Sequence, residues 1–427
     1  MSGHDDYLFA SCAHGSEAWL ADECRAICGP DVAVEPGRGG VSIAAGVDAA
    51  MRLNLHSRIA QRILWPLVDG PYASEHDLYA LARRVRWGDW ITPAETLRVD
   101  VSATRSPLKS LNFAALRIKD AVCDALREKT GERPSVDTRW PDLAITLHVA
   151  EEHAWLAIDL SGEALFKRGW REQQGEAPLK ETLAATMLAA AGWHGGEADG
   201  GLLDPCCGAG TIAIEAAQVA CRVAPGLQRR FAFERLRPFR DHARAWADLK
   251  EEAQARILPK PPVPIWAGDV SFRMTDFSVR NAERAGVAHA IDFKTMDALQ
   301  RMPPAERGTI LMNPPYGERI EARGTGSAPR TFTVPGAGGS GAGALRAERF
   351  ERGGREDTQG GTPAEFFSAL ASHWKRHYAG WTAWVLSPDM KLPTAMRLKE
   401  SKRTPMWNGP IECRLFRFDL VAGSARG

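Results

Sequence analysis

The sequence lacks any apolar run of the roughly 18 residues that a membrane-spanning helix needs. Its N-terminus, residues 1–6, is acidic and lacks the basic and apolar segments of a signal peptide. Its eight cysteines form no Cys-x-x-Cys pair, and the spacing of Cys24 and Cys28 is more typical of small apolar side chains on one helix face than of a zinc site. These absences argue against a membrane protein and a disulfide-rich secreted module, and they predict a cytoplasmic protein without a metal.

The length of 427 residues predicts two or three domains, and the content of 44% hydrophobic and 25% charged residues is typical of a globular chain. The net charge of +1 hides an uneven distribution. Residues 1–50 carry two basic and eight acidic residues, whereas residues 362–427 carry ten basic and five acidic ones. A basic C-terminal region is compatible with a polyanionic partner, and equally with an ordinary solvated surface.

Apolar periodicity predicts an α/β chain. Residues 1–50 predict a small module with a strand, a helix and two further strands. Residues 51–160 predict a second α/β module, with a long amphipathic helix at 112–129 and a hairpin at 143–160. From residue 179 onward, predicted strands and helices alternate to the end of the chain, which indicates a doubly wound parallel sheet of the Rossmann type.

Residues 322–362 interrupt this alternation. The segment is rich in glycine, contains few apolar residues and predicts a disordered insertion. Contact with RNA is the alternative interpretation of its arginines, which are Arg323, Arg330, Arg346, Arg349, Arg352 and Arg355.

The most specific chemical signal is the run Asn313-Pro314-Pro315-Tyr316, which follows an apolar strand-like stretch. The two prolines fix an extended corner that continues neither a helix nor a central strand. On this corner the Asn313 oxygen and the Pro314 carbonyl can accept both N–H bonds of an exocyclic amine, while the Tyr316 ring stacks on the base. The amine lone pair is then free to attack a methyl group. The motif is that of methyltransferases that use S-adenosylmethionine to modify planar amines.

A second signal is the run Asp204-Pro205-Cys206-Cys207-Gly208-Ala209-Gly210-Thr211, which lies between a predicted strand and a predicted helix. Gly208 and Gly210 allow a tight turn and a close approach to a ligand. The third glycine of a dehydrogenase fingerprint is absent, because Ala213 stands in its place, and no acidic residue follows about 20 positions later. Taken alone, the pattern also fits a purely structural turn.

Two acidic residues end the next predicted strands. Asp269 is placed to accept the ribose hydroxyls of a bound adenosine, with a helix N-cap as the alternative. Asp297, which Ala298 follows, is placed to accept the adenine amino group. No general base is evident near Asn313, and catalysis would rest on holding the sulfonium methyl in line with the amine.

The chain resembles the bacterial THUMP-containing methyltransferases that modify the N2 amine of a guanine in large-subunit (23S) ribosomal RNA. The motifs that carry this resemblance are residues 166–171, 177–181, 204–211, 224–227, 281–282 and 313–319. The resemblance implies a ferredoxin-like lead-in at 1–50, an RNA-gripping THUMP domain at 51–160 and a Rossmann-like methyltransferase domain at 161–427. A monomer is expected, although the sequence does not determine the oligomeric state. The family pattern Asp-Ile-Asp departs here to Asp269-Val270-Ser271.

By the same resemblance, S-adenosylmethionine is the cofactor, ribosomal RNA is the partner, and Asn313 to Tyr316 hold the target base. The expected cofactor residues are Asp204, Cys206, Gly208, Gly210, Thr211, Asp269, Asp297 and Ala298. The expected RNA-binding residues are Arg117, Lys119, Lys167, Arg168, Arg319, Lys399 and Arg403. Two other functions stay open: the same chemistry on another planar amine, such as adenine N6 of a nucleic acid or a protein glutamine, and a non-catalytic RNA-binding factor.

Overall fold

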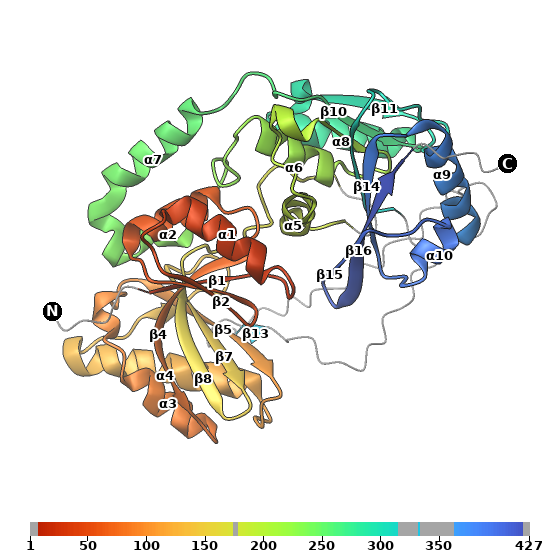
Figure 1. Ribbon diagram of the computed structural model, residues 1–427. Helices are drawn as coiled ribbons and strands as arrows, with labels where there is room; N and C mark the ends of the chain where they lie inside the picture. The colour runs from red at the N-terminus through yellow and green to blue at the C-terminus, as the bar shows by residue number, and fades with distance from the viewer. Residues whose placement is uncertain (1–6, 174–177, 315–331, 334–362, 422–427) are drawn as a thin grey trace.

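The computed structural model describes residues 7–173, 178–314, 332–333 and 363–421, and it contains two sheets, one in each half of the chain (Figure 1). The N-terminal half lies at the lower left of the view, and the C-terminal half lies at the upper right. The predicted α/β class, with two N-terminal modules on one sheet and a C-terminal doubly wound domain, is confirmed.

The N-terminal sheet has the strand order β13-β5-β7-β8-β4-β1-β3-β2. The longest strands are β4 (Arg62–Pro71) and β5 (Thr96–Thr104), and β4 joins the first module to the second by pairing with β1 on one side and β8 on the other. The other strands are β1 (Leu8–Ser11), β2 (Val34–Gly37), β3 (Gly40–Ile43), β6 (Ser135–Val136), which pairs with β5, β7 (Leu143–Ala150), β8 (His153–Asp159) and β13 (Phe332–Thr333). The helices are α1 (Glu17–Cys28), α2 (Val47–His56), α3 (Glu75–Arg83) and α4 (Leu111–Thr130).

Strand β13 comes from the predicted glycine-rich insertion. Phe332 and Thr333 pair antiparallel with Val101 and Asp100 at the edge of the N-terminal sheet. The rest of residues 322–362 lies outside the described residues.

The C-terminal sheet has the order β11-β10-β9-β12-β14-β16-β15. Its first five strands are parallel, and β16 and β15 close one edge as an antiparallel hairpin. The strands are β9 (Gly201–Asp204), β10 (Ile265–Asp269), β11 (Ile291–Thr295), β12 (Gly308–Met312), β14 (Trp381–Ser387), β15 (Lys402–Asn408) and β16 (Ile411–Leu420). The helices are α5 (Glu181–Ala191), α6 (Thr211–Ala220), α7 (Ala243–Ala255), α8 (Phe272–Arg284), α9 (Pro363–His377) and α10 (Leu392–Met396).

Two apolar cores cover the two faces of this sheet, as parallel strands require. Residues of β9 alternate between them: Leu202 packs in the core with α5 and α6, and Leu203 packs in the core with α9 and α10. Helices packed on both faces therefore fix the central strands, and the carboxyl ends of these strands fix where the following loops begin.

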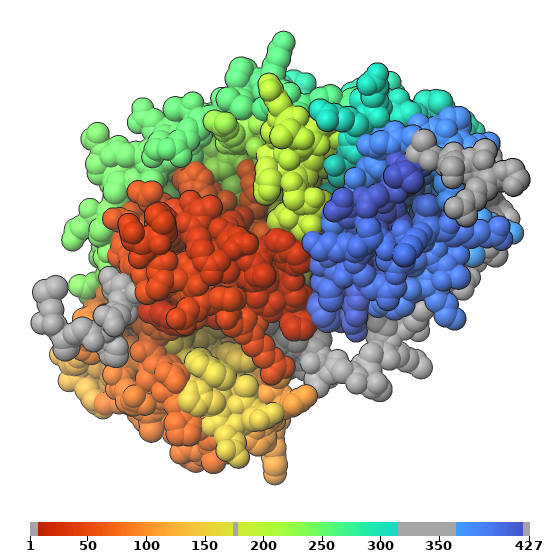
Figure 2. All heavy atoms as spheres, viewed as in Figure 1, coloured from red at the N-terminus to blue at the C-terminus, as the bar shows by residue number. Residues whose placement is uncertain are grey.

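The two halves of the chain contact each other at several places. Helix α7 belongs to the C-terminal half of the chain but lies against α2, and Phe233, Phe239 and Trp246 pack into the N-terminal core (Figure 1). On the face shown in Figure 2, the first module and the last strands meet directly. There the His14 ring lies 4.3 Å from that of Trp407, measured between ring centroids.

Candidate functional site

The two predicted motifs meet at the carboxyl edge of the C-terminal sheet. Strands β9 and β12 are parallel neighbours, with Leu203 opposite Ile310. Cys206 and Asn313 each follow three residues later, so both segments leave the sheet at the same level, on strands about 4.8 Å apart. Strand β12 ends at this point because Pro314 has no N–H for the ladder. The corner thus lies beside the glycine turn.

The glycine turn is also tied to β10. The backbone N–H of Gly208 donates to the Asp269 carboxylate at 3.0 Å, and that of Cys207 donates to the Gly268 carbonyl at 2.8 Å. The N–H of Gly210 closes the turn on the Cys207 carbonyl at 2.7 Å. These bonds hold the turn after β9 on the end of β10, and the pairing of β12 with β9 brings the end of β12 to the same edge.

The two glycines of the turn have different roles. Gly210 has φ +87°, and a Cβ there would lie 2.2 Å from Ser278 Oγ, so this glycine permits close packing of the turn on α8. Gly208 has φ +52°, and among the described residues no atom would lie within 4 Å of its Cβ. The open side of the turn is therefore at Gly208, where a ligand can approach the backbone.

The site is acidic. Asp204 is 1% exposed, and burial raises the pKa of its carboxyl well above the ordinary value, with a further contribution from Asp269. Burial, together with these carboxylates, also raises the pKa of the Cys206 and Cys207 thiols, which excludes a ready thiolate nucleophile. Such a cluster of carboxyl groups favours a cationic ligand.

Both strand-end aspartates also make local hydrogen bonds. Asp269 accepts from the Ser271 N–H at 3.0 Å, and Asp297 accepts from the Leu299 N–H at 2.9 Å. Ser271, which stands where the family pattern has a second acid, is the N-cap of α8 and accepts from Met274. Beside Asp269 lie exposed apolar side chains, Val270 (62% exposed) and Phe272 (75% exposed).

Thr211 and Ala298 are both buried, and Cys206 is partly buried. The Thr211 hydroxyl accepts from Arg171 at 2.7 Å, and Arg171 is paired with the Glu181 carboxylate at 2.8 Å. The cofactor roles of the eight predicted residues stay predictions. Asn313 is partly buried and Pro314 is buried, whereas Pro315, Tyr316 and Arg319 lie outside the described residues.

The prediction that Arg168 contacts RNA is wrong. Its side chain is 2% exposed, and its guanidinium pairs with Glu215 at 3.1 Å and donates to the carbonyls of Leu165 and Arg58. A cation that is enclosed in this way cannot reach a phosphate, so its role is structural.

The other predicted RNA contacts stay predictions. Lys167 is exposed and pairs with Glu163, while Lys399 and Arg403 are exposed on the C-terminal half. Arg117 and Lys119 are partly buried on α4, and both pair with Asp120.

Sequence reasoning gave no role to the buried side chain that joins the linker to the turn. Asn281 on α8 is fully buried and donates to the Ala209 carbonyl at 3.0 Å and to the Gln173 carbonyl at 2.9 Å. An amide on the buried face of α8 was the available signal, because a buried amide needs hydrogen-bond partners.

Within the described residues, no cluster of three or more His, Cys, Asp or Glu side chains is arranged to hold a metal ion. No helix in this part of the chain combines the length and apolarity needed to cross a membrane.

Comparisons with known proteins match three domain families along the chain. Residues 7–64 match the RlmL ferredoxin-like domain, residues 72–159 match the THUMP domain, and residues 168–328 match the RMKL-like methyltransferase domain. The domain boundaries predicted at residues 50 and 160 stay predictions.

A relative along nearly the whole chain is the ribosomal RNA large subunit methyltransferase K/L of Shewanella baltica (strain OS185). The two are 34% identical over 98% of this chain. The alignment covers 54% of the relative, so the chain spans about half the length of the proteins of this name that it matches.

Two solved structures have the same fold along nearly the whole chain. The crystal structure of SMU.472 complexed with SAH has a TM-score of 0.79 at 22% identity and covers 99% of each chain. The structure of a predicted N6-adenine-specific DNA methylase from Listeria monocytogenes str. 4b F2365 has a TM-score of 0.76 at 24% identity and covers 97% of this chain and 96% of that one. At this identity the two likenesses show the fold alone.

Proposed function

Since the chain belongs to the THUMP-containing methyltransferases, with RlmL ferredoxin-like and RMKL-like methyltransferase domains, we propose that it methylates the N2 amine of a guanine in large-subunit ribosomal RNA, with S-adenosylmethionine as the methyl donor. The relatives named K/L are about twice as long as this chain. The proposal concerns the single activity that the described residues support.

The observation that carries the proposal is the position of Asn313 beside the glycine turn. The register of β12 on β9 brings this carboxamide to the strand end at which Gly208 leaves an open approach. Open α/β sheets bind ligands at this edge, where neighbouring loops part.

The residues of the turn fit the proposed cofactor. A ligand with a sulfonium and an ammonium group carries positive charge, and the buried carboxyl of Asp204 lies next to that of Asp269. The open side at Gly208 admits a ligand to the backbone. When bound, S-adenosylmethionine supplies an electrophilic methyl group. The chain supplies the carboxylates and the turn that hold the donor.

On the substrate side, Asn313 and the Pro314 carbonyl accept the two N–H bonds of the guanine amine and fix its orientation. The rigid corner keeps the nitrogen lone pair directed at the donor, and such positioning lowers a barrier by about 7 kcal/mol or more in favourable cases. The base must leave its helix or be unpaired to reach the corner. The THUMP domain and the first module hold the surrounding RNA.

The test is the variant Asn313→Ala. We expect it to lose methyl transfer to large-subunit RNA by more than about 100-fold, since one positioned polar contact is removed, while the affinity for S-adenosylmethionine stays near that of the unchanged protein. The measurements are labelled methyl transfer, nucleoside analysis for N2-methylguanosine and calorimetric titration. Asn408→Ala, at the end of β15, is the control and should keep full activity.

Full activity of Asn313→Ala would contradict the assigned role. Appearance of N6-methyladenosine in place of N2-methylguanosine would favour the other planar amine. Absence of binding by the unchanged protein to S-adenosylmethionine would favour a non-catalytic RNA-binding factor.

A further inference from the structure

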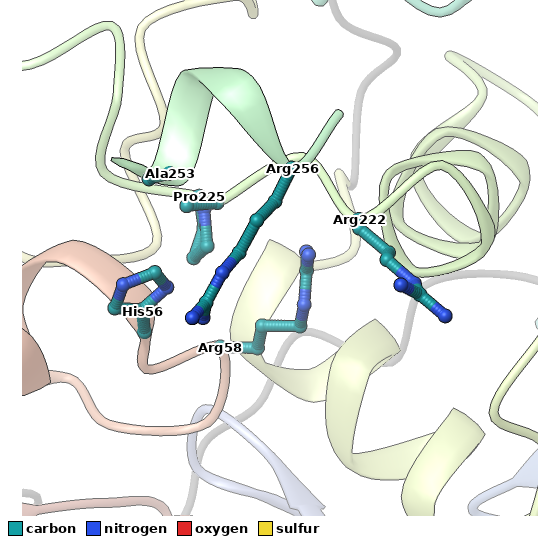
Figure 3. A pocket seen from close by; sticks show the side chains of 7 residues that line it. His56, Arg58, Arg222, Pro225, Ala253 and Arg256 are labelled. Carbon is teal, nitrogen blue, oxygen red and sulfur yellow. The ribbon is translucent and has the colours of Figure 1, made fainter. Parts of the chain in front are cut away.

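A basic cavity of about 400 Å³ lies where the two halves of the chain meet (Figure 3). His56 and Arg58 enter it from the end of α2 and the turn that follows. Arg222 and Pro225 come from the turn after α6, and Arg256 comes from the end of α7. The cavity is at the opposite end of α6 from the glycine turn, and a helix of this length spans about 15 Å.

The cavity carries an excess of positive charge. Only Glu252, paired with Arg256 at 2.5 Å, and Glu215, 3.7 Å from Arg58, pair with its arginines among the described residues. Burial lowers the pKa of His56, and Arg58 and Arg256 lower it further, while Glu252 acts in the opposite direction and Arg52 in the same one. Part of this lowering therefore comes from the surrounding arginines, and an anion bound in the cavity would oppose that part.

The cations are held at fixed places. One terminal nitrogen of Arg58 donates to the carbonyls of Val223 and Gln218. The other is buried 3.7 Å from the Glu215 carboxylate and has no hydrogen-bond partner among the described residues. The guanidinium of Arg256 extends from α7 toward His56 and Arg58, whereas the Arg222 side chain extends away from these three residues (Figure 3). Arg222 and Arg256 are exposed, so the cavity opens to solvent.

The backbone at Arg222 supports a role for this side chain. Its φ is +58°, the left-handed conformation, and its N–H bonds to the Val219 carbonyl while the N–H of Val223 bonds to the Gln218 carbonyl. This is the helix-ending arrangement in which glycine is favoured. An arginine in this conformation is less favourable than glycine, and it places a long cation at the rim of the cavity.

The cavity is larger than an inorganic ion and is in the range of pockets that hold nucleotide-sized ligands, about 300–1,000 Å³. Apolar surface from Pro225 and Ala253 lies beside the arginines. The turn that carries Pro225 is fixed on α2, since the N–H of Gly226 donates to the Leu55 carbonyl at 2.9 Å. The arginines suit a phosphate and the apolar surface suits a ribose. The imidazole ring can stack on a base.

We propose that this cavity binds one single-stranded nucleotide of the RNA substrate, with its phosphate at Arg58 and Arg256 and with Arg222 at the outer rim, where the strand leaves the cavity. The inference rests on the proposed function, because it takes RNA as the substrate. The bound nucleotide anchors the RNA at a distance from the reacting base, and it does so on the seam between the two halves.

The test compares two double variants with equal loss of charge. Arg222→Gly with Arg256→Gln removes both exposed cations of the cavity and relieves the strained backbone. Arg244→Gln with Arg280→Gln removes two exposed arginines that have acidic partners four residues away and lie outside the cavity. Binding of a labelled single-stranded oligoribonucleotide and of large-subunit RNA is measured between about 50 and 200 mM salt.

For the cavity variant we expect RNA affinity to fall roughly tenfold and the slope of log affinity against log salt to fall by about 1 to 2. Its thermal stability should equal or exceed that of the unchanged protein. The control should change RNA affinity less than about twofold. In the unchanged protein, histidine NMR should show the pKa of His56 rising when the oligoribonucleotide binds.

Equal losses in the two double variants would overturn the inference, as would an unchanged salt slope in the cavity variant. Inorganic phosphate and adenosine monophosphate are titrated in parallel. If either saturates at His56 while the RNA affinity of the cavity variant stays unchanged, the site serves a free phosphate compound and the inference fails. These outcomes are distinct from failure of the proposed function, in which the unchanged protein neither binds nor methylates RNA.

Discussion

The backbone N–H of Gly208 donates a hydrogen bond of 3.0 Å to the carboxylate of Asp269. This contact joins the turn after β9 to the end of β10, so the two predicted cofactor elements support each other. The same carboxylate accepts from the Ser271 N–H at the start of α8. A ligand at this edge would therefore meet a preformed turn.

Asp269→Ala should destabilise the protein and weaken cofactor binding together. The change leaves two backbone N–H groups without their acceptor, which costs about 1–3 kcal/mol each when they are buried and less when water reaches them. Urea unfolding measures the first effect, and titration with S-adenosylmethionine measures the second. Asp292→Ala, on neighbouring β11 in an exposed pair with Lys294, should show neither effect. Normal cofactor affinity in Asp269→Ala would contradict the role of this carboxylate.

The two glycines of the turn should respond differently to alanine. Gly208→Ala meets no atom of the described residues and should lose about 1–2 kcal/mol from its left-handed backbone. Gly210→Ala meets Ser278 as well, and overpacking should add about 1–3 kcal/mol. Unfolding free energies measure the difference, and Ser278→Ala in the Gly210→Ala background should recover part of it. Equal losses at the two positions would show that the contact with α8 is unimportant.

The sequence was sufficient for features that depend on local chemistry. Glycines after an apolar strand predicted the turn at Gly208 and Gly210, and the prolines after Met312 predicted the end of β12. Alternation of strands and helices predicted the doubly wound sheet. Each of these signals lies within a few residues of the feature it predicts.

Features that depend on contacts between distant segments were not predictable in this way. Arg168 was predicted to contact a phosphate because nothing near it in sequence indicates a buried ion pair. Its partner, Glu215, is 47 residues away along the chain. Strand β15 contains Pro405, which argues against a strand in the sequence, yet β15 is an edge strand, where proline is tolerated. The basic cavity combines residues 56–58, 222–225 and 253–256, which no local pattern connects.

Asp204 should make the stability of the protein depend on pH. Its pKa is raised in the folded state, mainly by burial, so the stability that the neutral carboxyl provides is complete below the ordinary value of 3.8 and is lost as the pH rises through the raised value. Asp204→Asn has no such titration and can still accept from the Cys206 N–H. Its unfolding free energy should therefore rise relative to the unchanged protein as pH increases from about 4.

Denaturant unfolding of both proteins over this pH range gives the comparison, and the exposed Asp292→Asn is the control. The difference between Asp204→Asn and the unchanged protein cancels the effect of other buried carboxyl groups, such as Asp159 and Glu181, whose pKa values burial also raises. A difference that is constant with pH would mean that Asp204 titrates normally.

Methionine substitutions of the neighbouring residues Lys167 and Arg168 should affect different properties, RNA binding for Lys167 and stability for Arg168. Arg168→Met leaves the buried Glu215 with only the longer contact to Arg58, so we expect a loss of about 3–5 kcal/mol in unfolding free energy. Arg168→Met combined with Glu215→Leu should be closer to the unchanged protein, because no carboxylate is left buried. Lys167→Met, at a 56% exposed side chain, should keep stability and weaken RNA binding instead. Unfolding and RNA-binding titrations on all three variants separate the two roles. Normal stability with weakened RNA binding in Arg168→Met would restore the RNA contact that its burial argues against.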